Sequence, residues 1–215
     1  MYSPDNSYKT IRKAQRELLQ LILDEGEEVE ETLEITNISV CFINPCLYLE
    51  DLDNLVTPIA QKHMSQMMIE KNCKSDKTHY ERLHIFKVDI YDNNGDHTHY
   101  IDQIEEIIKK LQENPLSKRC VLTLWSPEDC NDKYATSWVF SQLFIRNNKL
   151  IMTNYFRSCD LYNAFPWNVL GTAKLQKEIS QELGVEVGEF IVYIGSCHIY
   201  KNNLNRIKEY LELNK

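Results

Sequence analysis

The sequence is poor in the residues and segments that mark several classes of protein. Glycine and proline number only six each among 215 residues, which leaves little material for a long flexible linker. No run of about 20 apolar residues is present, so we expect no membrane-spanning helix and no membrane partner. The N-terminal residues lack a signal-peptide core. The seven cysteines are odd in number and scattered, without a CxxC pair or zinc-ligand spacing. We therefore expect a cytoplasmic protein with no disulfide framework and no metal.

Basic residues are also in deficit. There are 24 Lys and Arg against 32 Asp and Glu, giving a net charge of −8. This balance argues against binding a nucleic-acid polymer, which needs a basic face, but it leaves room for a local pocket that holds one phosphate. The remaining composition, with 43% hydrophobic and 26% charged residues, is ordinary for a globular protein. The length suits one core, so we expect a single domain over residues 1–215.

The apolar periodicity predicts an α+β fold, in which helices pack against a large, mostly antiparallel or mixed sheet. Helices are expected at residues 8–25, 55–68, 102–111 and 168–183 and at the C-terminus, and strands at 35–45, 85–92, 119–125, 138–145, 150–156 and 189–200. Residues 92–99 and 147–149 have turn composition.

Two segments carry side chains suited to a nucleotide. In YFRSCDLYNAFPWN, residues 155–168, Arg157 stands next to Ser158, and a guanidinium beside a hydroxyl suits a phosphate. Asn168 has a donor and an acceptor in one plane, which suits the edge of a pyrimidine. In GSCHIY, residues 195–200, His198 and Tyr200 lie two apart on a strand, so they share a face and can hold sugar hydroxyls.

These motifs, in this order, resemble thymidylate synthase and the related pyrimidine nucleotide hydroxymethylases. Further segments that resemble the family are YERL, residues 80–83; DQIEEIIKKLQENPLSKRCVLTLW, residues 102–125; and SQLFIRNNKL, residues 141–150. The resemblance covers residues 80–205, and residues 1–79 are divergent. It implies a thymidylate synthase-like fold and a transferase, of the methyl- or hydroxymethyltransferase kind, that modifies a pyrimidine nucleoside 5′-monophosphate.

The resemblance also implies roles for individual residues. Arg157 and Ser158 hold the phosphate, and Lys118 and Arg119 reach it from the second subunit of a homodimer. Gln142 lies near the nucleotide.

On the other side of the implied site, Asn168 reads O4 and N3 of the ring, which favours UMP or dUMP. His198 and Tyr200 hold the sugar hydroxyl. Asp160 faces the folate side.

The chain departs from the family at the nucleophile. The family's cysteine lies five residues before the hairpin glutamine, and here that position is Ser137. A serine hydroxyl has a much higher pKa than a thiol and needs a strong adjacent base to attack the ring. Cys130, seven residues upstream, is a second candidate nucleophile or an ordinary loop cysteine. Only 15 residues follow Tyr200, where the family has a longer segment that closes over a folate, so the use of methylenetetrahydrofolate stays open.

Several functions therefore remain possible for the chain, and several roles for the motif residues. One is one-carbon transfer to C5 or a diverged reaction at the same nucleotide site. The others are an N-glycoside hydrolase that acts on a pyrimidine nucleotide, and a catalytically inactive nucleotide-binding or partner subunit. The motif residues also have structural interpretations: a salt-bridge partner for Arg157, a helix N-cap for Asn168, core positions for His198 and Tyr200, and surface charges for Lys118 and Arg119.

Overall fold

A computed structural model describes residues 7–43, 79–92, 95–133 and 135–213. The elements in chain order are β1 (Ser7–Tyr8), α1 (Ile11–Glu25), β2 (Glu27–Val29), β3 (Thr32–Phe42), α3 (His79–His84), β4 (Phe86–Asp92), β5 (Gly95–Ile101), α4 (Gln103–Glu113), β6 (Cys120–Thr123), η3 (Pro127–Asn131), β7 (Trp138–Arg146), β8 (Lys149–Asp160), α5 (Phe165–Glu182), β9 (Glu186–Tyr200), η4 (Lys201–Asn203) and α6 (Leu204–Leu213). The helix expected at 55–68 lies outside the described residues.

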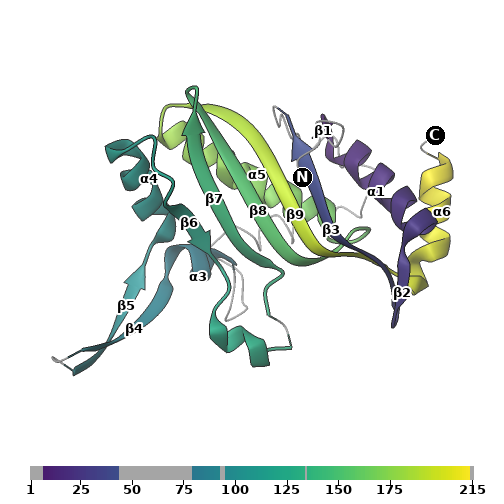
Figure 1. Cartoon of the computed structure of the whole chain (residues 1–215), viewed down its shortest axis with the longest axis horizontal. Coiled ribbons are helices and arrows are strands. Elements are labelled where there is room, and N and C mark those ends of the chain that lie inside the picture. Colours follow the sequence, from purple (N-terminus) through teal and green to yellow (C-terminus); the bar gives the residue numbers. More distant parts are fainter. Residues whose placement is uncertain (1–6, 44–78, 93–94, 134, 214–215) are drawn as a thin grey trace.

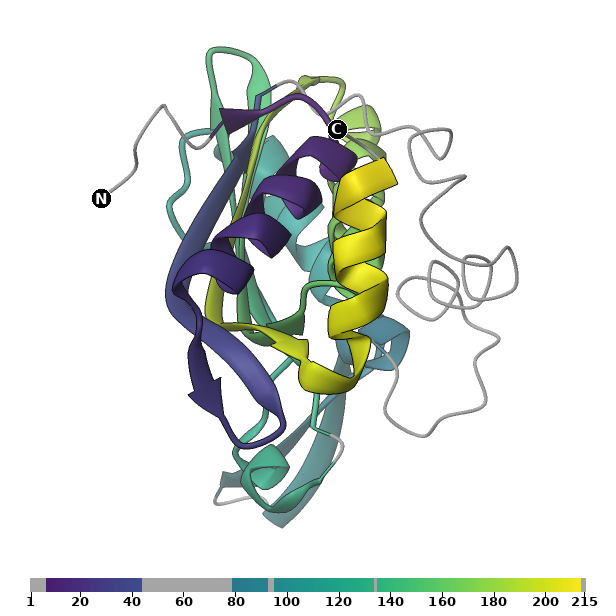
Figure 2. The same cartoon turned by 90° about the vertical axis from the view of Figure 1, so that its right-hand side faces the viewer.

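The fold is built on one large mixed sheet. Its strand order is β1-β3-β9-β8-β7-β6, and β2 also pairs with β3 (Figure 1). The β1–β3 and β8–β9 pairs are parallel and the other pairs are antiparallel. Helices α1 and α5 pack on one face, and α6 lies beside α1 (Figure 2). This arrangement confirms the α+β fold class with a large mixed sheet and packed helices.

Within the described part of the chain, no helix covers the opposite face of β7, β8 and β9 (Figures 1 and 2). None of the described helices is long and apolar enough to cross a bilayer.

Several boundaries differ from the sequence-based prediction, including the following three. Residues 92–99 are not simply a turn, because Gly95–Ile101 forms β5 and pairs with β4 in a separate hairpin. Strand pairing there outweighs the turn composition, and β5 is exposed along its whole length, which polar residues tolerate. Strand β3 begins earlier, at Thr32, because β2 pairs with its acidic start. Helix α5 begins at Phe165, with Ala164 at the N-cap, so the N-cap interpretation of Asn168 is wrong.

Two buried glutamines fix the ends of β8 relative to the helices. Gln15 of α1 donates its Nε2 hydrogens to the carbonyls of Leu161 and Tyr162, at 2.9 and 3.1 Å. Gln176 of α5 donates to the carbonyl of Leu150, at 2.7 Å, near the other end of the strand. Because buried amide groups need partners, these bonds hold β8 and the turn that follows it in one position.

A row of irregular residues crosses four neighbouring strands. At this row the alternation of side chains shifts by one residue, so that a different set of side chains points toward the helices on either side of it. We call Asn37, Gly195, Arg157 and Val139 the irregular row. Asn37 has a φ of 61° and Val139 lies at a register shift between β7 and β8. A Cβ at Gly195 would lie 2.8 Å from the carbonyl oxygen of Arg157, so the strands can approach only at a glycine. Before the row the even-numbered residues of β8 and β9 are buried, and after it the odd-numbered residues are.

Candidate functional site

Polar motif residues gather where β8 and β9 continue beyond the irregular row. The parallel register places Ser158 beside Ser196 and Asp160 beside His198. The residues between them in each strand are buried against the helices. The four polar side chains therefore share the face that the helices leave open.

Arg157 precedes this group and is fixed by backbone carbonyls. Its Nε donates to the carbonyl of Thr136 at 3.0 Å, and its Nη2 donates to that of Ala135 at 2.7 Å. The guanidinium lies 5.6 Å from the ring centroid of Trp125, and its Nη1 is 3.4 Å from the hydroxyl of Ser158. Arg157 is exposed, so a pre-oriented cation beside a hydroxyl faces solvent. Such a pair can bind an anion at low entropic cost.

The turn after β8 is held by Asp160. Its Oδ1 accepts hydrogen bonds from the backbone N–H groups of Tyr162 and Asn163, both at 3.1 Å, and its Oδ2 accepts one from the Asn163 side chain at 2.7 Å. This Asx-type turn carries the chain into the first turn of α5, where Asn168 is half-buried. The Asn168 Nδ2 lies 3.5 Å from the Cys159 sulfur, which orients the amide.

His198 lies within a short polar network on β9. Its Nδ1 is 3.3 Å from the Ser196 hydroxyl and 3.4 Å from the Ser196 carbonyl oxygen. The Ser196 hydroxyl also donates to Glu34, which pairs with His198 across the β3–β9 register. The His198 and Tyr200 rings meet edge to face at 5.5 Å. His198 is half-buried and Tyr200 is 42% exposed, so Tyr200 is not a core residue.

Ser137 lies next to the carbonyl groups that hold Arg157. Its carbonyl accepts the Arg157 backbone N–H at 2.8 Å, and Thr136 before it supplies a carbonyl to the guanidinium. His79 lies close by, with Nε2 at 2.9 Å from Thr136 Oγ1. Burial lowers the pKa of His79 to about 4, so its imidazole is neutral at pH 7.

The cysteines differ sharply in environment. Cys159 and Cys197 are cross-strand neighbours on the buried face, and burial raises the pKa of both thiols, to about 12 for Cys197. Both are therefore protonated at physiological pH and are poor nucleophiles. Cys130 is an exposed free cysteine in η3.

Gln142 of β7, and Lys118 and Arg119 just before β6, lie away from this group. The Gln142 amide donates to the Lys118 carbonyl at 3.0 Å, and both basic residues are exposed. Cys120, next to Arg119, pairs with Leu143 of β7, whereas Arg157 lies beyond the Trp138 end of that strand. At about 3.3 Å per residue, the two basic groups are roughly 20 Å apart along the strands. They cannot hold one phosphate within a single chain.

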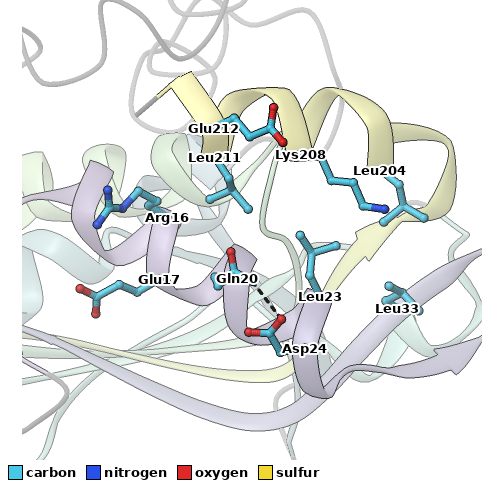
Figure 3. A pocket seen from close by; sticks show the side chains of 10 residues that line it. All are labelled: Arg16, Glu17, Gln20, Leu23, Asp24, Leu33, Leu204, Lys208, Leu211 and Glu212. Atoms are coloured by element: carbon cyan, nitrogen blue, oxygen red, sulfur yellow. Dashed lines mark hydrogen bonds between the residues drawn. The ribbon is translucent and has the colours of Figure 1, made fainter. Parts of the chain in front are cut away.

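A cavity of about 810 Å³ opens between α1 and α6 (Figure 3). Its leucines and its charged rim come from α1, β3 and α6, on the helix-covered side of the sheet. None of the motif residues lines it.

A family model described as thymidylate synthase matches residues 77–215, which is more than half of the chain. The chain belongs to the thymidylate synthase family. It is 38% identical over 114 residues to the thymidylate synthase of Oenococcus oeni, covering 52% of this chain and 35% of the relative. It is 36% identical over 112 residues to the thymidylate synthase of Listeria monocytogenes, covering 52% and 36%. It is 36% identical over 123 residues to the bifunctional dihydrofolate reductase-thymidylate synthase of Paramecium tetraurelia, covering 57% and 26%. The matches thus span about a third or less of each relative's length.

Membership of the thymidylate synthase family confirms the resemblance drawn from the motifs. The methylenetetrahydrofolate that this resemblance implies would have to meet Asp160 on one side of the site. That carboxylate already accepts three hydrogen bonds from its own turn. A carboxylate has about four acceptor sites, so one remains for a donor on a folate, and the folate-side role of Asp160 stays a prediction through which we derive no step. The described residues contain no cluster of His, Cys, Asp and Glu that could hold a metal ion.

Three residues of this candidate site were not singled out from the sequence. Glu34 lies in an acidic segment that reads as solvated surface, and Ser196 is an ordinary strand residue. His79 lies before the segment of clearest resemblance. Only the strand register and the packing of α3 bring these side chains to the motif residues.

Proposed function

We propose that this thymidylate synthase-family chain binds a pyrimidine nucleoside 5′-monophosphate at the open ends of β8 and β9, and that it is an enzyme that modifies this nucleotide. The observation that carries the proposal is the register. It pairs Ser158 with Ser196 and Asp160 with His198, so that Arg157 precedes these pairs, Tyr200 follows them, and Asn168 lies in the first turn of the next helix.

Each part of a nucleotide has a partner in this arrangement. The phosphate binds the Arg157 guanidinium and the Ser158 hydroxyl, since charge-assisted donors are the strongest available here. One Asn168 Nδ2 hydrogen is directed at Cys159 Sγ. The other Nδ2 hydrogen can donate to O4, while Oδ1 accepts N3–H, a pattern that selects uracil over cytosine. His198 and Tyr200 face the sugar.

The reaction is proposed as a group transfer to the ring or as a diverged reaction at the same nucleotide, with Ser137 at the nucleophile position. One observation favours a second candidate, hydrolysis of the base–sugar bond. The two buried thiols beside the motif are protonated, and therefore neither supplies the thiolate that addition to the ring needs. Hydrolysis needs only carboxylates and water. An inactive nucleotide-binding or partner subunit is the third outcome of the test.

We propose further that two copies of the chain associate through the open sheet face. This face exposes Val121, Phe140 and Tyr193 by 47%, 37% and 39%, and Phe140 stacks on Tyr155 at 5.6 Å. Apolar side chains of this size on an uncovered sheet are typical of an interface. If the two-fold axis lies between the two sheets and runs perpendicular to the strands, the strands of one copy run opposite to those of the other. Each end of one sheet then faces the opposite end of its partner. Lys118 and Arg119 of one copy would then approach Arg157 of the other.

The test is binding and turnover with one nucleotide panel. Purified protein is titrated calorimetrically with UMP, dUMP, CMP and dCMP. The same four are then incubated with and without methylenetetrahydrofolate, and the products are separated by chromatography. A C5-modified nucleotide supports transfer, a released base supports hydrolysis, and binding without product supports the inactive subunit. Absence of binding for all four refutes the nucleotide site. Sedimentation velocity of wild type and Phe140→Glu tests the dimer, which the charge should dissociate.

A further inference from the structure

Glu34 stands at the sugar end of the proposed nucleotide site and has no role there so far. It pairs with His198 across the antiparallel β3–β9 register, so both side chains project from the same face. It is half-buried. Its carboxylate accepts a hydrogen bond from the Ser196 hydroxyl, whose oxygen lies 3.3 Å from His198 Nδ1.

The network determines which groups remain for a ligand. The Ser196 hydroxyl gives its hydrogen to Glu34, so its oxygen can only accept from His198 Nδ1. The Ser196 carbonyl oxygen, 3.4 Å from the same nitrogen, also can only accept. Nδ1 therefore carries a hydrogen, and in the neutral imidazole Nε2 keeps a lone pair that can accept one sugar hydroxyl.

A carboxylate has more acceptor sites than the single Ser196 bond uses, and it offers no donor. Because His198 accepts one sugar hydroxyl, the donor available to the neighbouring Glu34 carboxylate is a second hydroxyl on the adjacent carbon of the sugar. Carboxylates serve ribose in this way in dinucleotide-binding proteins. A deoxyribose instead presents C–H to a half-buried anion, and an acceptor left unpaired on binding lowers affinity.

We propose that Glu34 is a specificity-determining residue that accepts a hydrogen bond from the ribose 2′-hydroxyl, so that the site prefers ribonucleotides over 2′-deoxyribonucleotides. The inference rests on the proposed function, since it needs a nucleotide in the site. The competing role for Glu34 is to position His198 through Ser196. These roles differ in outcome, because positioning affects both sugars equally, whereas a direct contact affects only ribose.

The experiment measures Kd for UMP and dUMP, and for CMP and dCMP, by titration calorimetry of the full chain. Each pair differs only in the 2′-hydroxyl. The wild type should bind the ribonucleotide about 10- to 100-fold more tightly, which is the range of a hydrogen bond to a charged group. In Glu34→Ala this ratio should fall to about one, through weaker ribonucleotide binding. In Glu34→Gln the amide oxygen still accepts, so a smaller preference should persist.

Two further variants separate the roles. Ser196→Ala removes the link to His198 and should weaken both sugars alike, which leaves the ratio unchanged. Glu186→Gln removes an exposed carboxylate at the other end of β9 and should change nothing. Thermal melts confirm that each variant is folded. Equal wild-type affinity for both sugars, or equal losses for both in Glu34→Ala, overturns the assignment of Glu34 and leaves the nucleotide site standing. A failure of all four nucleotides to bind overturns the proposed function and this inference with it.

Discussion

Replacing Arg157 by alanine gives the sharpest test of the phosphate site. The Nε and Nη2 groups hold the carbonyls of Thr136 and Ala135, and one Nη1 hydrogen is directed at the Ser158 hydroxyl, so the other Nη1 hydrogen and the second Nη2 hydrogen remain for a ligand. One or two charge-assisted hydrogen bonds are then lost, each worth about 1.5–3 kcal/mol. Because 1.4 kcal/mol is about tenfold in Kd, we expect UMP to bind about 10- to 100-fold more weakly, or worse if both bonds count fully.

The assay compares UMP with uridine in wild type and in Arg157→Ala, by titration calorimetry. Uridine lacks the phosphate, so its affinity should be unchanged by the substitution. Arg146→Ala is the matched control, since its Nη1 also donates to a backbone carbonyl, at 2.6 Å, but at the far end of the sheet. If uridine loses as much affinity as UMP, Arg157 acts by holding residues 135–136 in place. If UMP loses none, the phosphate lies elsewhere.

Three other predictions concern stability and reactivity. Arg82 and Asp129 form a bidentate ion pair at 2.6 and 2.7 Å, 11% and 1% exposed, so Arg82→Met should cost about 3–5 kcal/mol. Calorimetry should show a fall in Tm of roughly 6–20 °C. The Arg82→Met/Asp129→Leu double variant leaves no unpaired buried charge and should regain part of this Tm, and a double variant as unstable as the single one would contradict the reasoning. His79 has its pKa lowered to about 4 by burial, so the unfolded chain binds a proton at higher pH than the folded one. The free energy of unfolding should therefore fall by about 3 kcal/mol as the pH drops from 6.5 to 4. Urea titrations of His79→Gln should show a weaker dependence of this free energy on pH, and the same dependence as in the wild type would refute the reasoning. Iodoacetamide at pH 8 should label exposed Cys130 and spare Cys197, whose pKa is raised to about 12 by burial; peptide mass spectrometry that finds equal labelling would refute this.

Local patterns predicted the elements whose cause is local. Thr10 and Asp102 accept hydrogen bonds from the first turns of α1 and α4, as N-caps do, and the helix expected at residues 102–111 starts at this second cap. The turn between β7 and β8 was also readable, since Asn147 and Asn148 adopt φ values of 52° and 59°, which asparagine tolerates.

Features that depend on distant strands were not predictable. The β8 strand was expected to stop at residue 156, yet it continues to Asp160 because β9 pairs with it. The contribution of Glu34 depends on its register with a strand more than 160 residues later in the chain. No local alternation encodes such a register; it follows from the packing of the whole sheet.

The irregular row limits which changes in length the chain can accept. Side-chain direction in a strand depends on counting by two, and the row changes the count once, between residues 194 and 197 of β9. Deleting Gly195 would leave a regular alternation in β9, with Cys197 still on the buried face, but it would shift Ser196 and His198 by one residue against Asp160 of β8 and Glu34 of β3, while residues 186–194 kept their places. An insertion between Gly195 and His198 would shift these pairs in the opposite direction. Insertions and deletions that preserve the site should therefore fall in the turns between strands, such as the one at Asn147 and Asn148, and not inside β8 or β9.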